Sequence, residues 1–287
     1  CMYFYRTVLS ICHPEGGRSP AAWKGRDSMT GAHGRKRRPG GRLQLLDVIR
    51  GITLLSMIAY HGSWDLVYLA GVNWPWYHSE EAFLWQQSIC WTFILLSGYC
   101  MTLSSHKWKR GALVFAAGIL VTAATLVFLP EDVVVFGVLT FLGSAMLLTD
   151  VLENPLRKIP PLPGFVICAL LFYVTRWVNS GSLQLWKGSS FPLPAAWYQG
   201  NVMTFLGFTE PGFRSSDYFS FFPWIFLFWC GLYLGLWTGR CGSWKNVILQ
   251  INIPPLAFLG RNSLLIYLLH QPVLYMLVVL GTRYLRL

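Results

Sequence analysis

The sequence predicts an all-α integral membrane protein, with about seven transmembrane helices in one bundle behind a disordered, basic amino-terminal segment. Of its 287 residues, 54% are hydrophobic, only 12% are charged and 14 are tryptophan. The mean hydropathy is +0.45. Because a soluble domain carries about 25% charged residues, this composition excludes a soluble globular enzyme, a disordered chain and a disulfide-framework domain.

The amino-terminal segment is set apart by its charge. Residues 1–42 contain nine Lys and Arg against two acidic residues, a net charge of +7, and are rich in Gly, Arg and Pro without a helical or strand period. We therefore expect disorder over residues 1–41 and one membrane domain over 42–287. Met29 is an expected start, which would leave residues 1–28 outside the native protein. Basic residues gathered before the first apolar span are typical of a cytoplasmic anchor rather than of a nucleic-acid-binding face.

Apolar stretches recur along the rest of the chain. A membrane-spanning helix needs about 20 residues, and the sequence offers candidates at 46–70, 82–103, 111–129, 133–151, 161–178, 218–238 and 256–281. Lys and Arg concentrate in every second connection, which predicts a cytoplasmic amino terminus and an outer carboxyl terminus.

The first span carries a polar stripe. At 100° per residue, Asp47, Arg50, His61 and Asp65 fall within about 60° of one another on the helix surface. A charged side chain at mid-bilayer costs about 2.5–3.5 kcal/mol, so the stripe must face protein or a water-filled cavity. His61 and Asp65 are four residues apart, a spacing at which a carboxylate can orient an imidazole as a general base. The alternatives are a structural His–Asp pair and, for Asp47 with Arg50, an ion pair near the interface.

The last span repeats this pattern. Ser263 and His270 are seven residues apart and share a face, and His270 falls near the depth of His61. A mid-span histidine can also serve only to hydrogen-bond two helices. Asp217 and Tyr218, at the outer end of the sixth span, are expected at the mouth of the same cavity.

Several segments together resemble one family of membrane acyltransferases. They are RLQLLDVIRG (42–51), LSGYCM (96–101), FGVLTFLG (136–143), DYFSFFPW (217–224) and FLGRNSLLIYLLHQPVL (258–274). The family is the catalytic domain of heparan-α-glucosaminide N-acetyltransferase with its bacterial relatives. An arginine and a histidine separated by ten residues, here Arg50 and His61, also resemble the signature of the wider transmembrane acyltransferase group.

The resemblance implies a helical bundle, here in a bacterial plasma membrane, that passes an acetyl group from cytosolic acetyl-CoA to an amino sugar or glycan on the outer side. We expect His61, oriented by Asp65, to deprotonate the acceptor; an acetyl-histidine intermediate is the other route. Asn262, Ser263 or His270 would donate to the oxyanion. The expected contacts to acetyl-CoA are Arg50, Arg261, Asn262 and Ser263, and those to the acceptor are Asp217 and Tyr218.

Two other classes of function stay open at this level. A proton-coupled transporter would also use buried His and Asp, although no inverted repeat is visible. A non-catalytic scaffold or lipid-binding module would tolerate loss of the polar stripe. The seven cysteines form no CxxC and no zinc-binding motif occurs, so we expect no metal. We expect no nucleic acid partner, and a homo-oligomer is compatible with the sequence.

Overall fold

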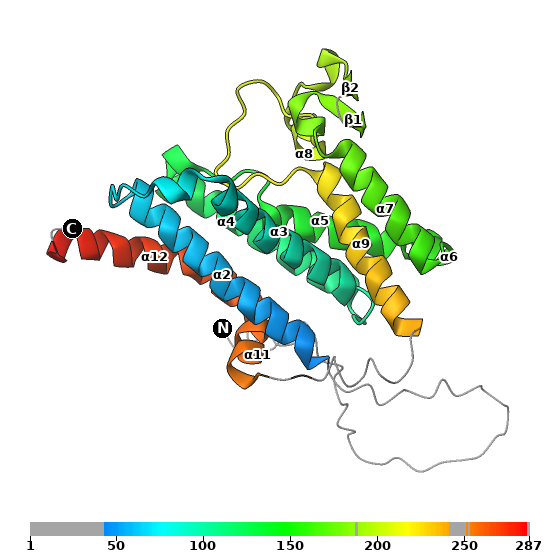
Figure 1. The fold of residues 1–287 in the computed structure, drawn as a ribbon, viewed down its shortest axis with the longest axis horizontal. Helices are drawn as coiled ribbons and strands as arrows, with labels where there is room; N and C mark the ends of the chain where they lie inside the picture. Colours follow the sequence, from blue (N-terminus) through cyan, green and yellow to red (C-terminus); the bar gives the residue numbers. More distant parts are fainter. Residues whose placement is uncertain (1–42, 187–188, 241–250, 252, 286–287) are drawn as a thin grey trace, which may run out of the picture.

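The computed structural model describes residues 43–186, 189–240, 251 and 253–285 (Figure 1), so the disorder predicted for residues 1–41 lies outside the described residues. The long helices are α2 (Gln44–Tyr68), α3 (Glu80–Cys100), α4 (Lys107–Phe128), α5 (Val138–Val151), α7 (Pro161–Thr175), α9 (Phe221–Arg240) and α12 (Ser263–Leu285). The short elements are η1 (Pro75–His78), η2 (Pro130–Asp132), α6 (Glu153–Lys158), η3 (Val178–Ser180), β1 (Ser182–Trp186), β2 (Ser189–Pro192), η4 (Ala195–Trp197), α8 (Asn201–Leu206) and α11 (Pro254–Arg261).

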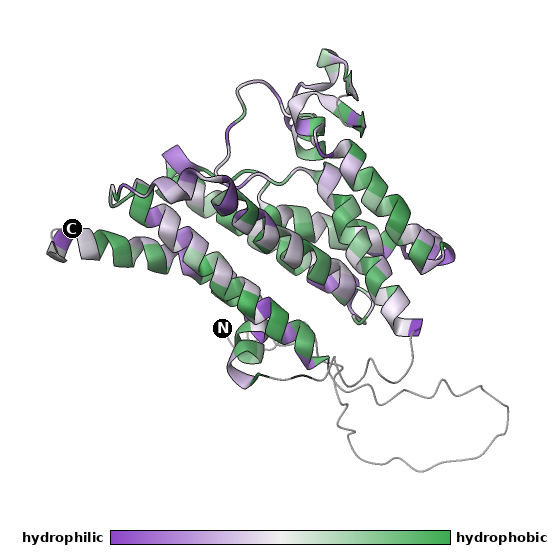
Figure 2. Ribbon diagram, in the orientation of Figure 1, coloured by the Kyte–Doolittle hydropathy of each residue, from purple (hydrophilic) through white to green (hydrophobic). Residues whose placement is uncertain are grey.

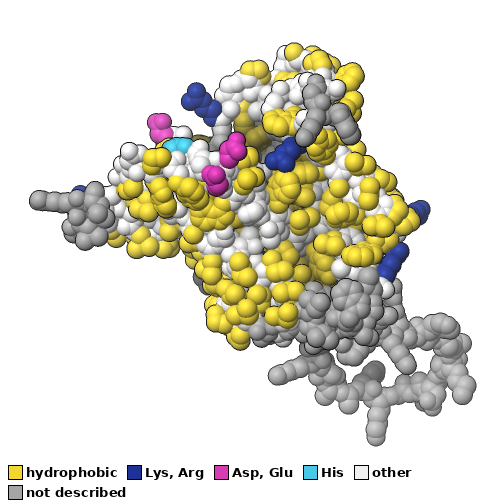
Figure 3. All heavy atoms as spheres, in the orientation of Figure 1, with side chains coloured by type: hydrophobic (Ala, Val, Ile, Leu, Met, Phe, Trp, Pro, Cys, Tyr) yellow, Lys and Arg dark blue, Asp and Glu magenta, His cyan; other side chains and the backbone are white. Residues whose placement is uncertain are grey.

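Five of the described helices are long and apolar enough to cross a membrane. They cover residues 44–68, 107–128, 161–180, 221–240 and 263–283. The predicted spans 82–103 and 133–151 coincide with α3 and α5, whereas the predicted span 256–281 is divided at Asn262 into α11 and α12. Helix α3 does not meet the same hydropathy criterion because glutamates and glutamines occupy its first two turns, and α5 has only 14 residues. Hydrophobic residues dominate the helices (Figure 2), and hydrophobic side chains are spread over much of the described surface seen in Figure 3, where charged side chains are few.

The helices pack in three sets that are connected through α3. Helix α2 packs against α11 and α12, whereas α9 packs against α7, and α4 against α5. Helix α3 contacts α2, α5 and α9 and so connects the sets. The carboxyl-terminal half of α12 extends beyond the other helices (Figure 1). The largest buried cluster lies between α3, α4, α5, α7 and α9 and is centred on Phe141, Ile225, Phe228 and Tyr233.

Glycines set the close helix crossings. A Cβ atom at Gly51 of α2 would overlap the carbonyl of Leu256 in α11, and one at Gly260 of α11 would overlap the carbonyl of Asp47. The α3–α9 crossing is built in the same reciprocal way, by Gly98 and Gly231. Small residues allow this approach, and the van der Waals contacts that result hold helices together where lipid removes the hydrophobic driving force.

The long connection between α7 and α9 is folded rather than a plain loop. It contains an antiparallel hairpin in which Ser182 pairs with Pro192, so a small sheet is added to the predicted all-α fold. Its last part runs beside residues 133–136. Ser215 Oγ accepts from the N–H of Val135 and donates to its carbonyl, both at 2.9 Å, and the N–H of Phe219 donates to the carbonyl of Phe136. We call residues 215–219 the strap; these hydrogen bonds hold its Asp217 beside the start of α5.

Candidate functional site

Three of the four residues of the polar stripe of α2 are buried within the protein, and His61 is partly exposed. Asp47, Arg50 and Asp65 are 2%, 6% and 0% exposed. Arg50 Nη1 lies 3.6 Å from Asp47 Oδ1, and its Nη2 donates to the Cys100 sulfur of α3 at 3.0 Å. Burial of these groups follows from their shared helix face, because α11, α12 and α3 cover that side of α2.

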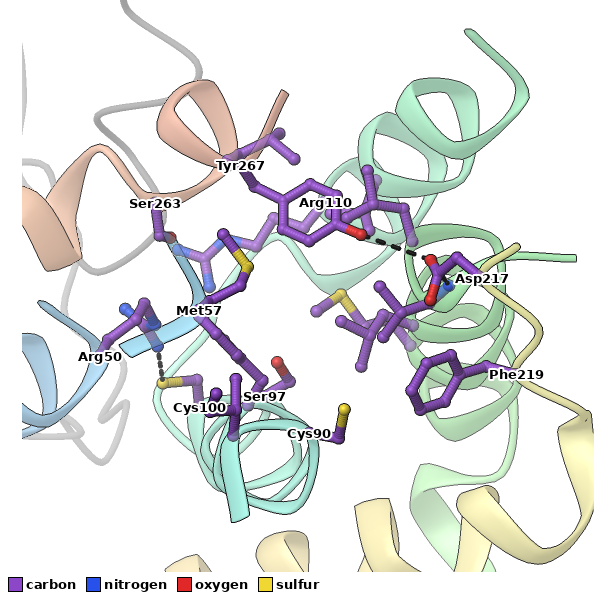
Figure 4. Close-up of a pocket in the computed structure, with 18 of the residues that line it drawn as sticks. Arg50, Met57, Cys90, Ser97, Cys100, Arg110, Asp217, Phe219, Ser263 and Tyr267 are labelled. Carbon is purple, nitrogen blue, oxygen red and sulfur yellow. Dashed lines mark hydrogen bonds between the residues drawn. The ribbon is translucent and has the colours of Figure 1, made fainter. Parts of the chain in front are cut away.

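One large cavity runs between α2, α3, α4, α5 and α12. We call it the central cavity; it contains about 1420 Å³ of empty space, part of it open to solvent. Arg50, Cys100 and Ser263 gather at one end (Figure 4), and Arg110 in the first turn of α4 lines the cavity with them. This end lies where α2, α4 and α12 begin and α3 finishes, so we call it the arginine end.

The opposite end of the cavity, the histidine end, is lined by groups that can exchange protons or donate hydrogen bonds. His61 lies there, eleven residues beyond Arg50 on α2 and therefore about 16 Å along the helix axis. The other polar residues at this end are Tyr60, Gln86, Ser216, Asp217 and Tyr267. The cavity wall between the two ends is mostly apolar and includes Met57, Leu113 and Leu142.

Asp217 joins three segments at the cavity wall. Its Oδ2 accepts from the backbone N–H of Val138 at 3.1 Å and from the hydroxyl of Tyr267 at 3.4 Å (Figure 4). Burial raises the pKa of the Asp217 carboxyl above its ordinary value, although these two donors hold it back in part. The residue thereby caps the start of α5 and fixes a phenol of α12 in the cavity.

His61 and His270 meet where α2 crosses α12. Their ring centres are 5.0 Å apart. His270 is 9% exposed, and its Nδ1 lies 2.6 Å from the carbonyl oxygen of Tyr267. Asp65 is turned to a different partner, since its Oδ1 accepts from Gln271 Nε2 at 2.9 Å. The structure thus brings the two predicted histidines together and places the Asp65 carboxyl against an amide of α12.

Three other predicted site residues do not line the central cavity. Arg261 Nε donates to the carbonyl of Ala257 at 3.1 Å, and Asn262 Nδ2 to that of Phe258 at 2.9 Å. Both side chains therefore satisfy carbonyls near the end of α11. The Tyr218 hydroxyl donates to the carbonyl of Thr204, away from the cavity. Ser263 and Asp217 do line it, whereas Asp47 lies behind Arg50.

The sequence analysis missed Arg110 and Tyr267 as candidate cavity residues. Arg110 follows Lys107 and Lys109, so it counts toward the basic loop that predicts orientation and carries no separate signal. Tyr267 looks like an ordinary aromatic of an apolar span. A helical face argument could have found it, because Ser263, Tyr267 and His270 are spaced by four and three residues.

Comparison with known proteins gives one match. The family model described as heparan-alpha-glucosaminide N-acetyltransferase, catalytic, matches residues 42–272, a range that includes all the residues named above as lining the central cavity. Neither the curated proteins nor the solved structures that were compared gave a match.

Proposed function

The chain belongs to the heparan-alpha-glucosaminide N-acetyltransferase catalytic family, and we propose that it is a membrane enzyme that moves an acetyl group from cytosolic acetyl-CoA to an amino sugar or glycan at the outer side. The central cavity carries this proposal. It joins Arg50 and Arg110 at one end to His61 at the other along an apolar path. A donor held at the first end and an acceptor at the second would meet inside one protein.

The residues present suit acetyl-CoA. Its phosphates are anionic, and Arg50 and Arg110 offer guanidinium groups that recognise phosphate through several hydrogen bonds. Ser263 adds a hydroxyl at the same end. The narrow pantetheine arm would lie along the apolar wall past Met57 and Leu142. When bound, acetyl-CoA supplies an acetyl group activated as a thioester.

The histidine end supplies the base. His61 faces the cavity, so its ring can take a proton from an amine or hydroxyl of the acceptor during attack on the thioester. Asp217 lies in the same part of the wall and can accept a hydrogen bond from the acceptor. Orientation follows from the basic connections: the arginine end would face the cytoplasm, where acetyl-CoA is made, and the histidine end the outer side.

Transfer of labelled acetyl from acetyl-CoA to a panel of amino sugars and glycans tests the proposal with purified protein in detergent. His61→Ala is run beside the wild type, and thermal unfolding is measured with and without CoA for both. We expect transfer by the wild type only, with CoA stabilising both proteins, because the substitution removes the base and leaves the arginine end intact.

Two results would contradict the proposal. Absence of both CoA stabilisation and transfer in the wild type would exclude the donor and the reaction together. Equal transfer by the wild type and His61→Ala would exclude His61 as the base. If His61→Ala also lost CoA stabilisation and unfolded at a lower temperature, the residue would be structural instead.

A further inference from the structure

We propose that His270 is a positioning residue that accepts the second ring proton of His61, so that the two imidazoles act as a relay that holds the proton of the acceptor behind the central cavity until it is returned. The inference rests on the proposed function for its chemistry. Its structural part is a hydrogen-bonded histidine pair in which His270 has one defined tautomer. This part can be tested without an assay of acetyl transfer.

The tautomer of His270 follows from its partner. A backbone carbonyl oxygen can only accept a hydrogen bond, so the Nδ1 atom at 2.6 Å from the Tyr267 carbonyl must carry a proton. In neutral His270 the other nitrogen, Nε2, is then bare and can only accept. The structure shows Nε2 buried without a hydrogen-bond partner among the described residues.

His61 is a donor whose ring lies beside that of His270. A separation of 5.0 Å between the ring centres leaves room for an N–H···N hydrogen bond of about 2.9 Å, reached by rotation of the His61 ring while His270 keeps its bond to Tyr267. An unpaired buried acceptor costs about 1–3 kcal/mol, which favours that rotation. His61 also lines the cavity, whereas His270 is not among the cavity-lining residues. One ring of the pair therefore faces the acceptor substrate and the other lies behind it.

Asp65 is unsuited to orient His61. Its Oδ1 accepts from the Gln271 amide, while its Oδ2 and the Gln271 Oε1 are both buried without a hydrogen-bond partner among the described residues. A single proton on Oδ2, donated to Oε1, would satisfy both atoms and form a closed acid–amide pair. In that form Asp65 is neutral and ties α2 to α12, which leaves His270 as the partner for His61.

The relay conserves protons and electrons. As the acceptor nitrogen or oxygen bonds to the acetyl carbon, the carbon–sulfur bond breaks and its electron pair stays on the CoA sulfur. The proton of the attacking atom moves to one nitrogen of His61, and the proton on the other nitrogen moves to His270 Nε2. His270 becomes an imidazolium held by the Tyr267 carbonyl. Return of the proton through His61 to the CoA thiolate restores the starting state.

Nitrogen NMR tests the pair directly. Protein labelled with ¹⁵N-histidine and ¹³C-carbonyl tyrosine identifies His270 through magnetisation transfer from the Tyr267 carbonyl to Nδ1. We expect a protonated Nδ1 and a bare Nε2 whose resonance shifts when His61→Ala removes its donor. A protonated Nε2, or an Nε2 resonance unchanged in His61→Ala, would overturn the inference.

Kinetics provide the second test. The titratable groups that bear on the pair are Asp65, Tyr60, Tyr267 and Asp217 in addition to the two histidines. We expect His270→Gln to lower kcat about 10- to 100-fold, to keep the KM for acetyl-CoA, and to change the shape of the pH profile of kcat. A uniform loss at every pH would indicate a structural role and contradict the relay.

The control is Met276→Ala, on the same helix at a side chain that is 53% exposed, which should leave kcat and its pH profile unchanged. Thermal unfolding shows whether His270→Gln remains folded. If the wild type transfers no acetyl group, the proposed function fails, yet the wild-type and His61→Ala spectra still decide whether the histidine pair exists. If transfer occurs and His270→Gln keeps the full kcat, only the relay fails.

Discussion

At the scale of single residues, Arg110 differs from its basic neighbours in where its side chain lies. Lys107, Lys109 and Arg110 belong to the same turn of α4, but their side chains leave the helix in different directions. Arg110 lines the central cavity, Lys107 pairs with Glu153, and Lys109 is exposed. The helix rotation alone separates a substrate-binding candidate from an ion-pair partner, Lys107, and an exposed residue, Lys109.

Replacing Arg110 with glutamine tests this assignment. A hydrogen bond to a charged group contributes about 1.5–3 kcal/mol, so Arg110→Gln should raise the KM for acetyl-CoA roughly 10- to 100-fold with a smaller effect on kcat. Lys109→Gln removes the same charge one residue away and should leave KM unchanged. Steady-state kinetics on both variants decide the point, and equal effects would show that only the overall charge matters.

At the scale of elements, backbone approach determines the helix crossings. Gly231 of α9 lies against the backbone of Leu95 in α3, whereas Gly239, two turns later in the same helix, has no atom within 4 Å of an added Cβ. Both glycines lie in the same helix and only Gly231 has a close neighbour, so substitutions at the two positions can be compared directly.

Gly231→Ala should destabilise the protein by about 1–3 kcal/mol, the usual cost of overpacking, because the backbone of Leu95 cannot move without α3. Gly239→Ala should be neutral or slightly stabilising, since alanine favours helix. Thermal unfolding of both variants in one detergent gives the comparison. Similar unfolding temperatures for the two would show that the α3–α9 crossing is looser than the structure indicates.

A second element contact ties α4 to α6. Glu153 accepts from Lys107 and, at 2.6 Å, from Arg157. Partial burial raises the pKa of Glu153, but its two basic partners outweigh this effect and hold the pKa below its ordinary value. The stabilisation is therefore present above the unfolded-state pKa of the carboxyl and is lost as the pH falls through the folded-state pKa.

Glu153→Gln should accordingly lower the unfolding temperature at pH 7 and have a smaller effect near pH 3, because the contribution of the carboxylate declines as the pH falls toward its lowered pKa. Glu131→Gln, in the exposed η2 turn, serves as the control and should be neutral at both values. Unfolding temperatures across this range check the sign. A larger loss at pH 3 than at pH 7 would contradict the assignment.

For the whole molecule, the end-to-end arrangement of helices fixes which segments share a side of the membrane. The contacts of Ser215 with Val135 put the strap and the start of α5 at one end. The contact of Lys107 with Glu153 puts the start of α4 and α6 at the other. If the arginine end is cytoplasmic, as we propose, the β1–β2 hairpin lies on the outer side.

Single-cysteine labelling tests this orientation in a background whose native cysteines are replaced by alanine. Ser189→Cys in the hairpin should react with a membrane-impermeant maleimide in intact cells. Ser105→Cys, in the connection between α3 and α4, should react only after permeabilisation. Both side chains are exposed, so access to the reagent is the sole difference, and the reverse pattern would invert the topology.

The sequence is informative about everything that depends on one segment at a time. Composition and apolar length identify a membrane protein, and helical periodicity places Asp47, Arg50, His61 and Asp65 on one face of α2. The predicted spans fall on helices of the described residues, although the last one is divided between α11 and α12, and five helices meet the length and hydropathy required for crossing. These inferences succeed because hydropathy and the helical repeat are local properties of the chain.

Tertiary structure decided which side chains meet. The four-residue spacing predicts that Asp65 orients His61, yet α12 approaches α2 so that Gln271 binds Asp65 and His270 faces His61. Arg261 and Asn262 turn to their own helix, while Arg110 reaches the central cavity. Contacts between helices depend on their rotation and crossing, which are set by glycines and core packing distant in sequence. Helical periodicity places a residue on a face of its own helix but does not determine what packs against that face.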